Sequence, residues 1–109
     1  MQKYILTQDI GLFSCKAALF SVNGTLIKSN VVHYSPQNSS EGWAWQSPDL
    51  WWSAFCQNCR ILLANIPSKS VVGVSMCGQM MGCLPVDKDL HPICDSITWD
   101  DRRSSRQVM

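Results

Sequence analysis

The sequence lacks a surplus of charge of either sign and has no long basic run. Nine Lys and Arg residues face eight Asp and Glu residues, for a formal net charge of +1, and the arginines that stand nearest together are Arg102, Arg103 and Arg106. Binding to nucleic acid or to an acidic membrane depends on a concentrated positive patch. We therefore expect neither nucleic acid nor a membrane as a partner.

Long apolar runs are missing as well. A membrane-spanning helix needs about 20 consecutive apolar residues, whereas the apolar start at Tyr4-Ile5-Leu6 is interrupted by Gln8 and Asp9. No secretory signal peptide is recognisable. These absences predict a soluble, cytoplasmic protein. Its 109 residues, 46% of them apolar, suffice for the core of one small domain.

Cysteine, by contrast, is abundant, with six residues. An even number predicts a disulfide framework in a short secreted chain, but the secretory signal is missing. Free cysteine inside or beside an apolar run behaves as a small buried hydrophobic residue, and this description fits Cys15, Cys77, Cys83 and Cys94. We therefore expect reduced thiols in a reducing compartment.

Cys56 and Cys59 form a CxxC pair, which is typical of zinc or redox sites. The pair falls within a predicted helix, and no second CxxC or pair of histidines follows at the spacing of a zinc module. His33 and His91 stand alone, so no Ser/His/Asp or Cys/His arrangement for nucleophilic catalysis can be assigned. A zinc-binding module remains an alternative interpretation of the six cysteines.

Three strands are predicted at the start of the chain. Residues 3–10 begin apolar, residues 15–22 are rich in small and apolar side chains, and Gly11 marks the turn between them. Asn23-Gly24 is typical of a two-residue hairpin turn, since both residues tolerate positive φ. It leads into a third strand over 25–34, so the sequence predicts an opening β-meander.

One amphipathic helix follows a polar loop over 35–46. Ser47 at the N-cap and Pro48 at the first helical position are the residues expected at a helix start. Pro67 ends a series of apolar residues that recur at three- and four-residue spacing: Trp51, Trp52, Phe55, Cys59, Leu62, Leu63 and Ile66.

Further strands are predicted after the helix. Residues 70–76 suit a buried strand, reached by a right-handed crossover onto the same sheet. Residues 83–86 and 93–99 are predicted as short strands around a turn at 87–89, and a second helix is predicted to begin at Asp100. This order of elements predicts an α/β fold with a mixed sheet.

The first candidate site comprises Asp9, Gly11 and Lys16, where the first strand ends and the second begins. A carboxylate at a strand end can hold Mg²⁺ through water, and the backbone amides of a glycine turn can approach a phosphate closely. The alternative is that Asp9 and Gly11 simply make a tight hairpin.

The second candidate site is the loop Gly78-Gln79-Met80-Met81-Gly82. Open α/β sheets bind ligands beyond strand ends, and the two glycines bring amide and thioether groups close to a cleft that suits a polyhydroxylated ligand. The alternative is a loop with two core-filling methionines.

The third candidate site comprises Trp99, Asp101 and Arg103. Asp101 can accept hydrogen bonds from sugar hydroxyls, Arg103 can donate to them or steady Asp101, and Trp99 offers a flat apolar face. The alternative is an ordinary helix start, since acids before bases is the order that the helix dipole favours.

Together these segments resemble the amino-terminal part of the FGGY carbohydrate kinases, most closely their xylulokinase-like members. Residues 42–52 (GWAWQSPDLWW) are similar to the GWxEQxPxxWW stretch at the family's first helix. Residues 78–82 (GQMMG) are similar to its GQMHG sugar-site loop, and residues 97–103 (ITWDDRR) to its WxDxR segment. The three motifs occur in the family's order and the resemblance covers nearly the whole chain.

The resemblance implies ATP-dependent phosphorylation of a ketose such as xylulose, or of a related polyol. MgATP would lie in a cleft between two actin-like, ribonuclease-H-like domains. Asp9 matches the family's first-strand aspartate near the metal and the transferring phosphate, with Gly11 and Lys16 on the same side. The residues implied on the sugar side are Gln79, Met80, Met81, Trp99, Asp101 and Arg103.

Three residues depart from the family's pattern. Leu12 replaces the hydroxyl residue of the phosphate-binding DxGT, Met81 replaces a sugar-contacting histidine, and Trp45 replaces the glutamate of GWxEQ. We therefore expect phosphate handling and sugar specificity to differ from those of xylulokinases.

The resemblance also implies where the general base, the second phosphate loop and the adenosine pocket come from. In the family they lie in sequence that follows the part matched by these residues. We expect residues 1–109 to be the first part of the N-terminal domain, with no catalytic base of its own. It should need the remainder of the kinase, in the same or a separate chain, for activity. A half-domain leaves an apolar sheet face uncovered, so we expect self-association. A non-catalytic remnant that binds a sugar or a partner is the alternative.

Overall fold

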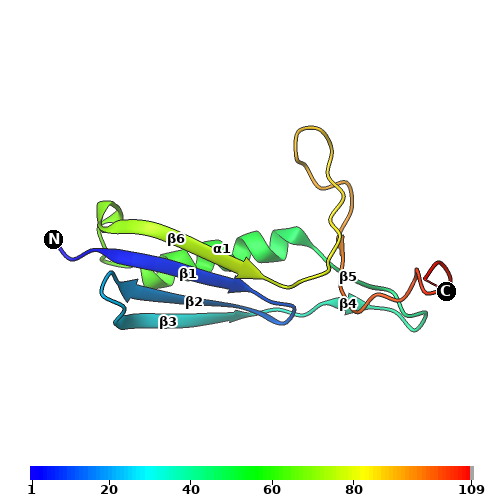
Figure 1. The fold of residues 1–109 in the computed structure, drawn as a ribbon, viewed down its shortest axis with the longest axis horizontal. Helices are drawn as coiled ribbons and strands as arrows, with labels where there is room; N and C mark the ends of the chain where they lie inside the picture. The colour runs from blue at the N-terminus through cyan, green and yellow to red at the C-terminus, as the bar shows by residue number, and fades with distance from the viewer. Residues whose placement is uncertain (109) are drawn as a thin grey trace.

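The first three strands form the predicted meander (Figure 1). In the computed structural model, which describes residues 1–108, β1 (Tyr4–Ile10), β2 (Ser14–Ser21) and β3 (Leu26–His33) pair antiparallel in chain order. The turn after β2 contains Gly24 at φ +92°, a conformation that glycine adopts without strain. The predicted β-meander is confirmed.

The helix α1 (Pro48–Leu62) begins at the predicted residue. The Ser47 hydroxyl accepts a hydrogen bond from the Asp49 N–H, and the proline lies in the first turn. The helix ends before the predicted Ile66, because Asn65 adopts the left-handed region at φ 65°. A residue that precedes a proline, as Ile66 does, also disfavours helical geometry.

After α1 the chain passes through a short 3-10 helix, η1 (Ser68–Ser70), into β6 (Val71–Gly78), which pairs parallel with β1. The sheet has the mixed order β3-β2-β1-β6, so the predicted crossover onto the same sheet is confirmed, whereas its right-handedness stays a prediction. The prediction that this strand is buried is wrong, since Val72, Val74 and Met76 are 52%, 55% and 54% exposed. The reason is that β6 is an edge strand and α1 packs mainly against β2 and β3.

A second, three-stranded sheet extends beyond one end of the first (Figure 1). It contains β4 (Gln37–Asn38), β5 (Ala44–Gln46) and β7 (Ser96–Ile97), in the order β4-β5-β7. The sequence predicts only a polar loop over 35–46, because strands this short carry no readable alternation and depend on a partner far along the chain.

The last part of the chain is less regular than predicted. The expected strand over 83–86 is reduced to single bridges, Cys83 with Ile97 and Val86 with Pro92, on a hairpin that projects from the sheet (Figure 1). The expected strand over 93–99 contains only β7. The predicted helix at Asp100 is wrong for the described residues, which form turns there.

The physical reason for the missing second helix is the Asp101 side chain. Its carboxylate accepts hydrogen bonds from the backbone N–H groups of Ala44 and Arg103. An aspartate that bonds the N–H group two residues ahead offers the backbone an alternative to the helix. The segment is therefore tied to β5 as a turn.

The core between α1 and the sheet combines an apolar cluster with a polar network. The apolar cluster contains Leu6, Ala17, Leu19 and Leu62. Beside it, Gln8 Oε1 accepts hydrogen bonds from the Cys15 thiol at 3.2 Å and from Asn58 Nδ2 at 3.1 Å. Asn58 Nδ2 also donates to the Cys15 carbonyl, and Asn58 Oδ1 accepts from Asn30 Nδ2 at 2.9 Å. The network ties α1 to all three strands of the meander.

Asn58→Ala should destabilise the fold by about 2–3 kcal/mol, because it removes the hydrogen bonds from this side chain to β1, β2 and β3 and leaves space at a fully buried position. Urea unfolding followed by circular dichroism measures the loss. Gln57→Ala on the exposed side of the same helix is the matched control and should cost little. Equal destabilisation by the two variants would contradict the assigned role of the network.

All six cysteines are free. Cys15 is buried as predicted, but the predicted burial of Cys77, Cys83 and Cys94 is wrong. These three lie on the edge strand and on the projecting hairpin, which no second layer covers in the part of the chain that the structure describes. None of the helices among residues 1–108 is long and apolar enough to cross a membrane.

Candidate active site

The predicted phosphate side lies on the uncovered face of the sheet. Asp9, near the end of β1, is opposite Lys16 on β2 and Cys77 on β6. Side chains alternate along a strand, and Gln8 faces α1, so Asp9 points to the other face. Together with Lys16 and Cys77 it lines a hollow of about 380 Å³. Desolvation and the neighbouring Asp9 carboxylate raise the pKa of the Cys77 thiol.

Gly11 makes the turn that follows Asp9. Its N–H donates to the Ser14 carbonyl at 2.9 Å, and a Cβ at Gly11 would lie only 3.2 Å from the same oxygen. The Tyr34 hydroxyl donates to the Gly11 carbonyl at 2.7 Å. Burial raises the pKa of Tyr34 to about 12, so this hydroxyl stays protonated as a donor at neutral pH. The turn is thus held in one conformation, and the structure brings Asp9, Gly11 and Lys16 into one region.

The predicted sugar loop begins beside this turn. The Gln79 N–H donates to the Ile10 carbonyl at 3.0 Å, which places the end of β6 next to the end of β1. Gln79 and Met81 line a cavity of about 330 Å³, and Cys77 lines both this cavity and the hollow beside Asp9. The alternative of two core-filling methionines is wrong, because Met80 and Met81 are 78% and 88% exposed.

In the third candidate site, the side chains of Asp101 and Arg103 bond to each other. The side chain of Asp101 is 3% exposed and accepts bonds from the Ala44 N–H at 2.7 Å, from the Arg103 N–H and from the Arg103 guanidinium. Arg103 in turn lies 4.2 Å from the centre of the Trp43 ring. Trp99 is exposed. The cluster fixes the turn after β7 against β5.

The two predicted halves of the sugar side do not share a cavity among the described residues. Gln79 and Met81 line the 330 Å³ cavity near α1, whereas Arg103 lines another of about 310 Å³ with Trp43 and Trp45. In this structure the candidate residues therefore form one group around the ends of β1 and β6 and a second group at the small sheet.

Asp101→Asn should destabilise the chain at pH 7, and the difference from the unaltered protein should vanish in acid. The hydrogen bonds from Arg103, with those from the backbone, lower the pKa of Asp101 from 3.8 to about 2. A depressed folded-state pKa gives stability that is present above the unfolded value and is lost as the pH falls through the folded value. Urea unfolding at pH 7, 3 and 2 measures this trend.

The matched control for this prediction is Asp95→Asn, a change at an exposed aspartate of the same region. It should cost little stability at pH 7. A destabilisation by Asp101→Asn that stays constant down to pH 2 would contradict the ion-pair assignment.

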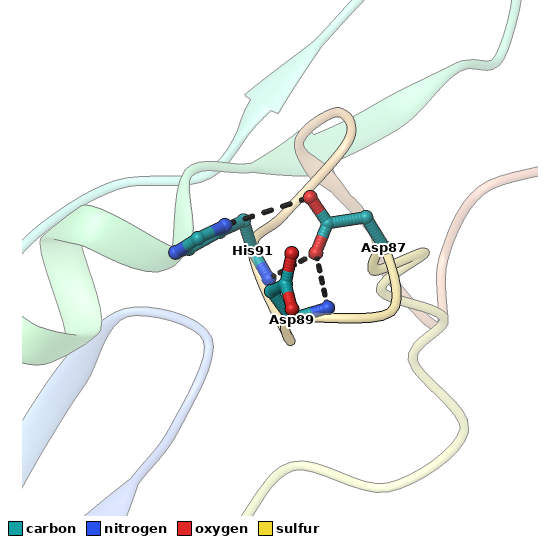
Figure 2. Close-up of side chains that lie close together, drawn as sticks. All are labelled: Asp87, Asp89 and His91. Carbon is teal, nitrogen blue, oxygen red and sulfur yellow. Dashed lines mark hydrogen bonds and ion pairs between the residues drawn. The ribbon is translucent and has the colours of Figure 1, made fainter.

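Asp87, Asp89 and His91 bring their ligand atoms within 4.8 Å of one another on the projecting hairpin. Figure 2 shows that Asp87 is already engaged, since its Oδ1 accepts the N–H groups of Asp89 and His91 at 2.9 Å. Its Oδ2 lies 3.5 Å from His91 Nδ1. All three residues are exposed, so the cluster is explained as the hydrogen-bonded turn that the sequence predicts at 87–89.

The CxxC pair on α1 does not assemble a zinc site in the described residues. Cys59 Sγ accepts a hydrogen bond from Gln8 Nε2 at 3.4 Å. Burial raises the pKa of Cys59, which disfavours the thiolate that zinc requires. The one group of three candidate metal-ligating side chains within residues 1–108 is the exposed hairpin cluster, which contains no cysteine.

Sequence reasoning missed two residues that the structure places between the candidate segments. Gln46 on β5 is fully buried, and it bonds Leu12, Trp51 and Gln79. The sequence predicts Trp51 as part of an apolar helix face and of the 42–52 motif, but not as a hydrogen-bond donor. A glutamine at the end of a polar stretch reads as a loop residue, so only its place in the GWxEQ-like motif could have marked it.

The chain is similar to sugar kinases over almost all its length. It is 28% identical over 105 residues to the xylulose kinase of Staphylococcus xylosus and 32% identical over 104 residues to the gluconokinase of Bacillus licheniformis. These alignments cover 96% and 95% of this chain but 22% and 20% of the two relatives. A crystal structure of gluconate kinase from Lactobacillus acidophilus matches with a TM-score of 0.90 at 27% identity, over 99% of this chain and 22% of that one.

These similarities confirm the predicted fold class, an actin-like α/β fold with a mixed sheet. The chain spans about a fifth of the length of the curated relatives it matches, at 22% and 20%. A profile described as the FGGY family of carbohydrate kinases, N-terminal domain, matches residues 4–109. The chain therefore belongs to the FGGY family of carbohydrate kinases and carries sequence of its N-terminal domain.

Proposed function

We propose that this chain supplies part of the phosphate side and part of the sugar side of an ATP-dependent carbohydrate kinase. The observation that supports this most is the position of Cys77, which lines both the hollow beside Asp9 and the cavity beside Gln79. Phosphoryl transfer depends on holding the attacking hydroxyl close to the phosphate. Two ligand spaces that meet at the ends of β1 and β6 fit this requirement.

The residues of the phosphate side fit Mg²⁺ and ATP. Asp9 is a half-buried carboxylate at a strand end, and Mg²⁺ is held in proteins by one or two carboxylates through several waters. Lys16 adds a positive charge across from it on β2. Bound MgATP supplies the phosphoryl group, and the role we assign to Asp9 is to hold the metal through water.

Leu12 shapes how phosphate can be bound in this chain. Its side chain is buried in the core, and its carbonyl accepts a hydrogen bond from Gln46 Nε2 at 2.9 Å. A hydroxyl at this position would add a donor, which Leu12 cannot do. In the proposed enzyme Lys16 would contact the phosphate, together with backbone N–H groups of the turn other than that of Gly11, which already donates to Ser14.

The proposed substrate is a small polyhydroxylated compound, a ketose such as xylulose or a related polyol or sugar acid. Gln79 offers an amide to the hydroxyl groups of such a ligand in the 330 Å³ cavity, and Met81 offers apolar surface to its carbon face. Asp101 and Arg103 hold each other, so we assign them to fixing the loop that carries Trp99.

The proposed enzyme needs the remainder of the kinase, in this chain's own continuation or in a separate chain, for the general base and the adenosine pocket. A base must lie within hydrogen-bond reach of the attacking hydroxyl, and the Asp9 carboxylate is assigned to the metal. The alternative, a non-catalytic module that binds a sugar or a partner, is favoured by Leu12. We also propose that the protein is located in the reducing cytoplasm, where its six cysteines stay free thiols.

Protection of Cys77 from alkylation tests this assignment in the protein that contains the chain. Xylulose, gluconate or MgATP should slow the reaction of Cys77 with iodoacetamide, because the thiol borders both ligand spaces. Cys94, exposed at the far hairpin, is the internal control and should react at an unchanged rate. Mass spectrometry of the two peptides reads both rates. Equal rates for Cys77 with and without every ligand would contradict the proposed site.

A further inference from the structure

Gln46 links three separate segments of the candidate site from a position with 0% exposure. Its Nε2 donates to the carbonyl of Leu12, in the turn after β1, at 2.9 Å. Its Oε1 accepts from Trp51 Nε1 on α1 at 2.8 Å and from Gln79 Nε2, after β6, at 3.2 Å. Both the nitrogen and the oxygen of the Gln46 side-chain amide are thus hydrogen-bonded.

The chemistry of these partners fixes the orientation of the Gln46 amide. The Leu12 carbonyl can only accept a hydrogen bond, and the indole N–H of Trp51 can only donate one. The Gln46 nitrogen must therefore face Leu12 and its oxygen must face Trp51. These two partners thus fix which end of the amide is nitrogen and which is oxygen, which the shape of the amide alone leaves open.

The fixed orientation of Gln46 determines that of Gln79. Only the NH₂ group of Gln79 can donate to Gln46 Oε1, so Gln79 Oε1 must lie on the other side of that amide. This oxygen is buried and accepts no hydrogen bond from any residue within 1–108. Gln79 lines the 330 Å³ cavity. A buried acceptor without a partner is unfavourable unless a ligand donates to it.

We infer that Gln46 is a positioning residue that orients the Gln79 amide, so that Gln79 Oε1 accepts a hydrogen bond from a hydroxyl of the ligand. The cavity then selects a hydroxyl donor at this point over a group that can only accept, such as a carboxylate. That the hydroxyl belongs to a sugar rests on the proposed function. The orientation of the amide rests only on the contacts of Gln46.

NMR spectroscopy of the 109-residue chain tests the orientation without any sugar. In Gln46→Met the indole N–H resonance of Trp51 and the side-chain amide resonances of Gln79 should both shift, and the Gln79 NH₂ protons should lose their protection from exchange. Gln37→Met, a change at an exposed glutamine on β4, is the matched control and should move neither. If the chain self-associates, magic-angle-spinning NMR reads the same resonances.

Gln46→Glu provides a conservative variant if Gln46→Met does not fold. When protonated, the introduced carboxyl group can donate to Leu12 and accept from Trp51 and Gln79, as the amide does. Burial favours this neutral form. The Gln79 resonances should therefore match those of the unaltered chain at low pH, and the stability should fall as the pH rises and the introduced carboxyl group ionises. Unperturbed Gln79 resonances in Gln46→Met, with a shifted Trp51, would overturn the inference.

Glycerol and acetate serve as probes of the cavity itself. Glycerol, which offers hydroxyl donors, should shift the Gln79 side-chain resonances, whereas acetate, which only accepts, should not. An equal shift with both, or none with glycerol, would overturn the selection of a hydroxyl. Failure of the proposed kinase function would show instead as absence of sugar phosphorylation by the complete protein, with the glycerol response intact.

Discussion

Asp9→Asn should lower kcat of the proposed sugar kinase, assayed as the complete protein, by about 100-fold or more, with little change in the KM for the sugar. The amide keeps the size of the side chain but removes the negative charge that we assign to the hydrated metal. The loss therefore falls on phosphoryl transfer, whereas the sugar cavity beside Gln79 is unchanged. Steady-state kinetics with saturating MgATP measures both constants.

The matched control for Asp9→Asn is Asp49→Asn, a change at an exposed carboxylate on the first turn of α1. It removes the same charge away from both ligand spaces and should leave kcat unchanged. If Asp9→Asn also retains full kcat, Asp9 does not hold the metal. The proposed phosphate side would then have to be assigned elsewhere.

Residues 1–109 alone should self-associate through β6. This edge strand presents Val72, Val74 and Met76 at more than half exposure. Met76 and the exposed Trp52 of α1 line one apolar hollow. A flat apolar edge with free backbone donors and acceptors is a template for pairing with another chain. Sedimentation velocity of the purified chain should therefore show oligomers. A variant with a charged residue on this edge strand should be a monomer at the same concentration.

Val74→Lys tests which surface drives this association. A lysine on an edge strand opposes pairing with a second strand, so this variant should move most of the protein to the monomer. Leu90→Lys, at an exposed apolar residue on the projecting hairpin, is the matched control and should leave the oligomers in place. A monodisperse monomer for the unaltered chain would contradict the prediction.

The sequence predicts well those elements whose signals are local. The Asn23-Gly24 turn and the Ser47-Pro48 cap each involve adjacent residues, and both stand where predicted. The predicted two-residue form of the turn is wrong, because only Gly24 adopts a positive φ and the strands end at Ser21 and resume at Leu26. Family motifs likewise identify the Gln79 loop and Asp9, which the structure brings to neighbouring strand ends. Here local propensity and tertiary structure agree.

The failures arise where a distant partner decides the outcome. The small sheet joins β5 to β7, and two- or three-residue strands exist only because that pairing forms. Asp101 reads as a helix-start acid, yet its bond to Ala44 turns the chain instead. The prediction that β6 is buried is wrong for a related reason. Its apolar composition indicates that a second layer should cover it, but it does not indicate whether residues 1–108 supply that layer.

The candidate site shows the same division. Apart from its place in the 42–52 motif, Gln46 gives no local signal, because its importance comes from contacts with Leu12, Trp51 and Gln79 in three separate segments. Conversely, Arg103 carries a recognisable motif, but the structure pairs it with Asp101 and Trp43 away from the Gln79 cavity. Motifs thus point to the neighbourhood of a site, and contacts assign the roles within it.

The most direct measurement is phosphoryl transfer from MgATP to xylulose and gluconate by the protein encoded by the complete reading frame that contains codons 1–109. The isolated chain is assayed in parallel. We expect sugar-dependent ADP release from the complete protein, abolished by Asp9→Asn, and none from the isolated chain. A complete protein that binds these sugars but never releases ADP would contradict the kinase assignment and favour a non-catalytic sugar-binding module.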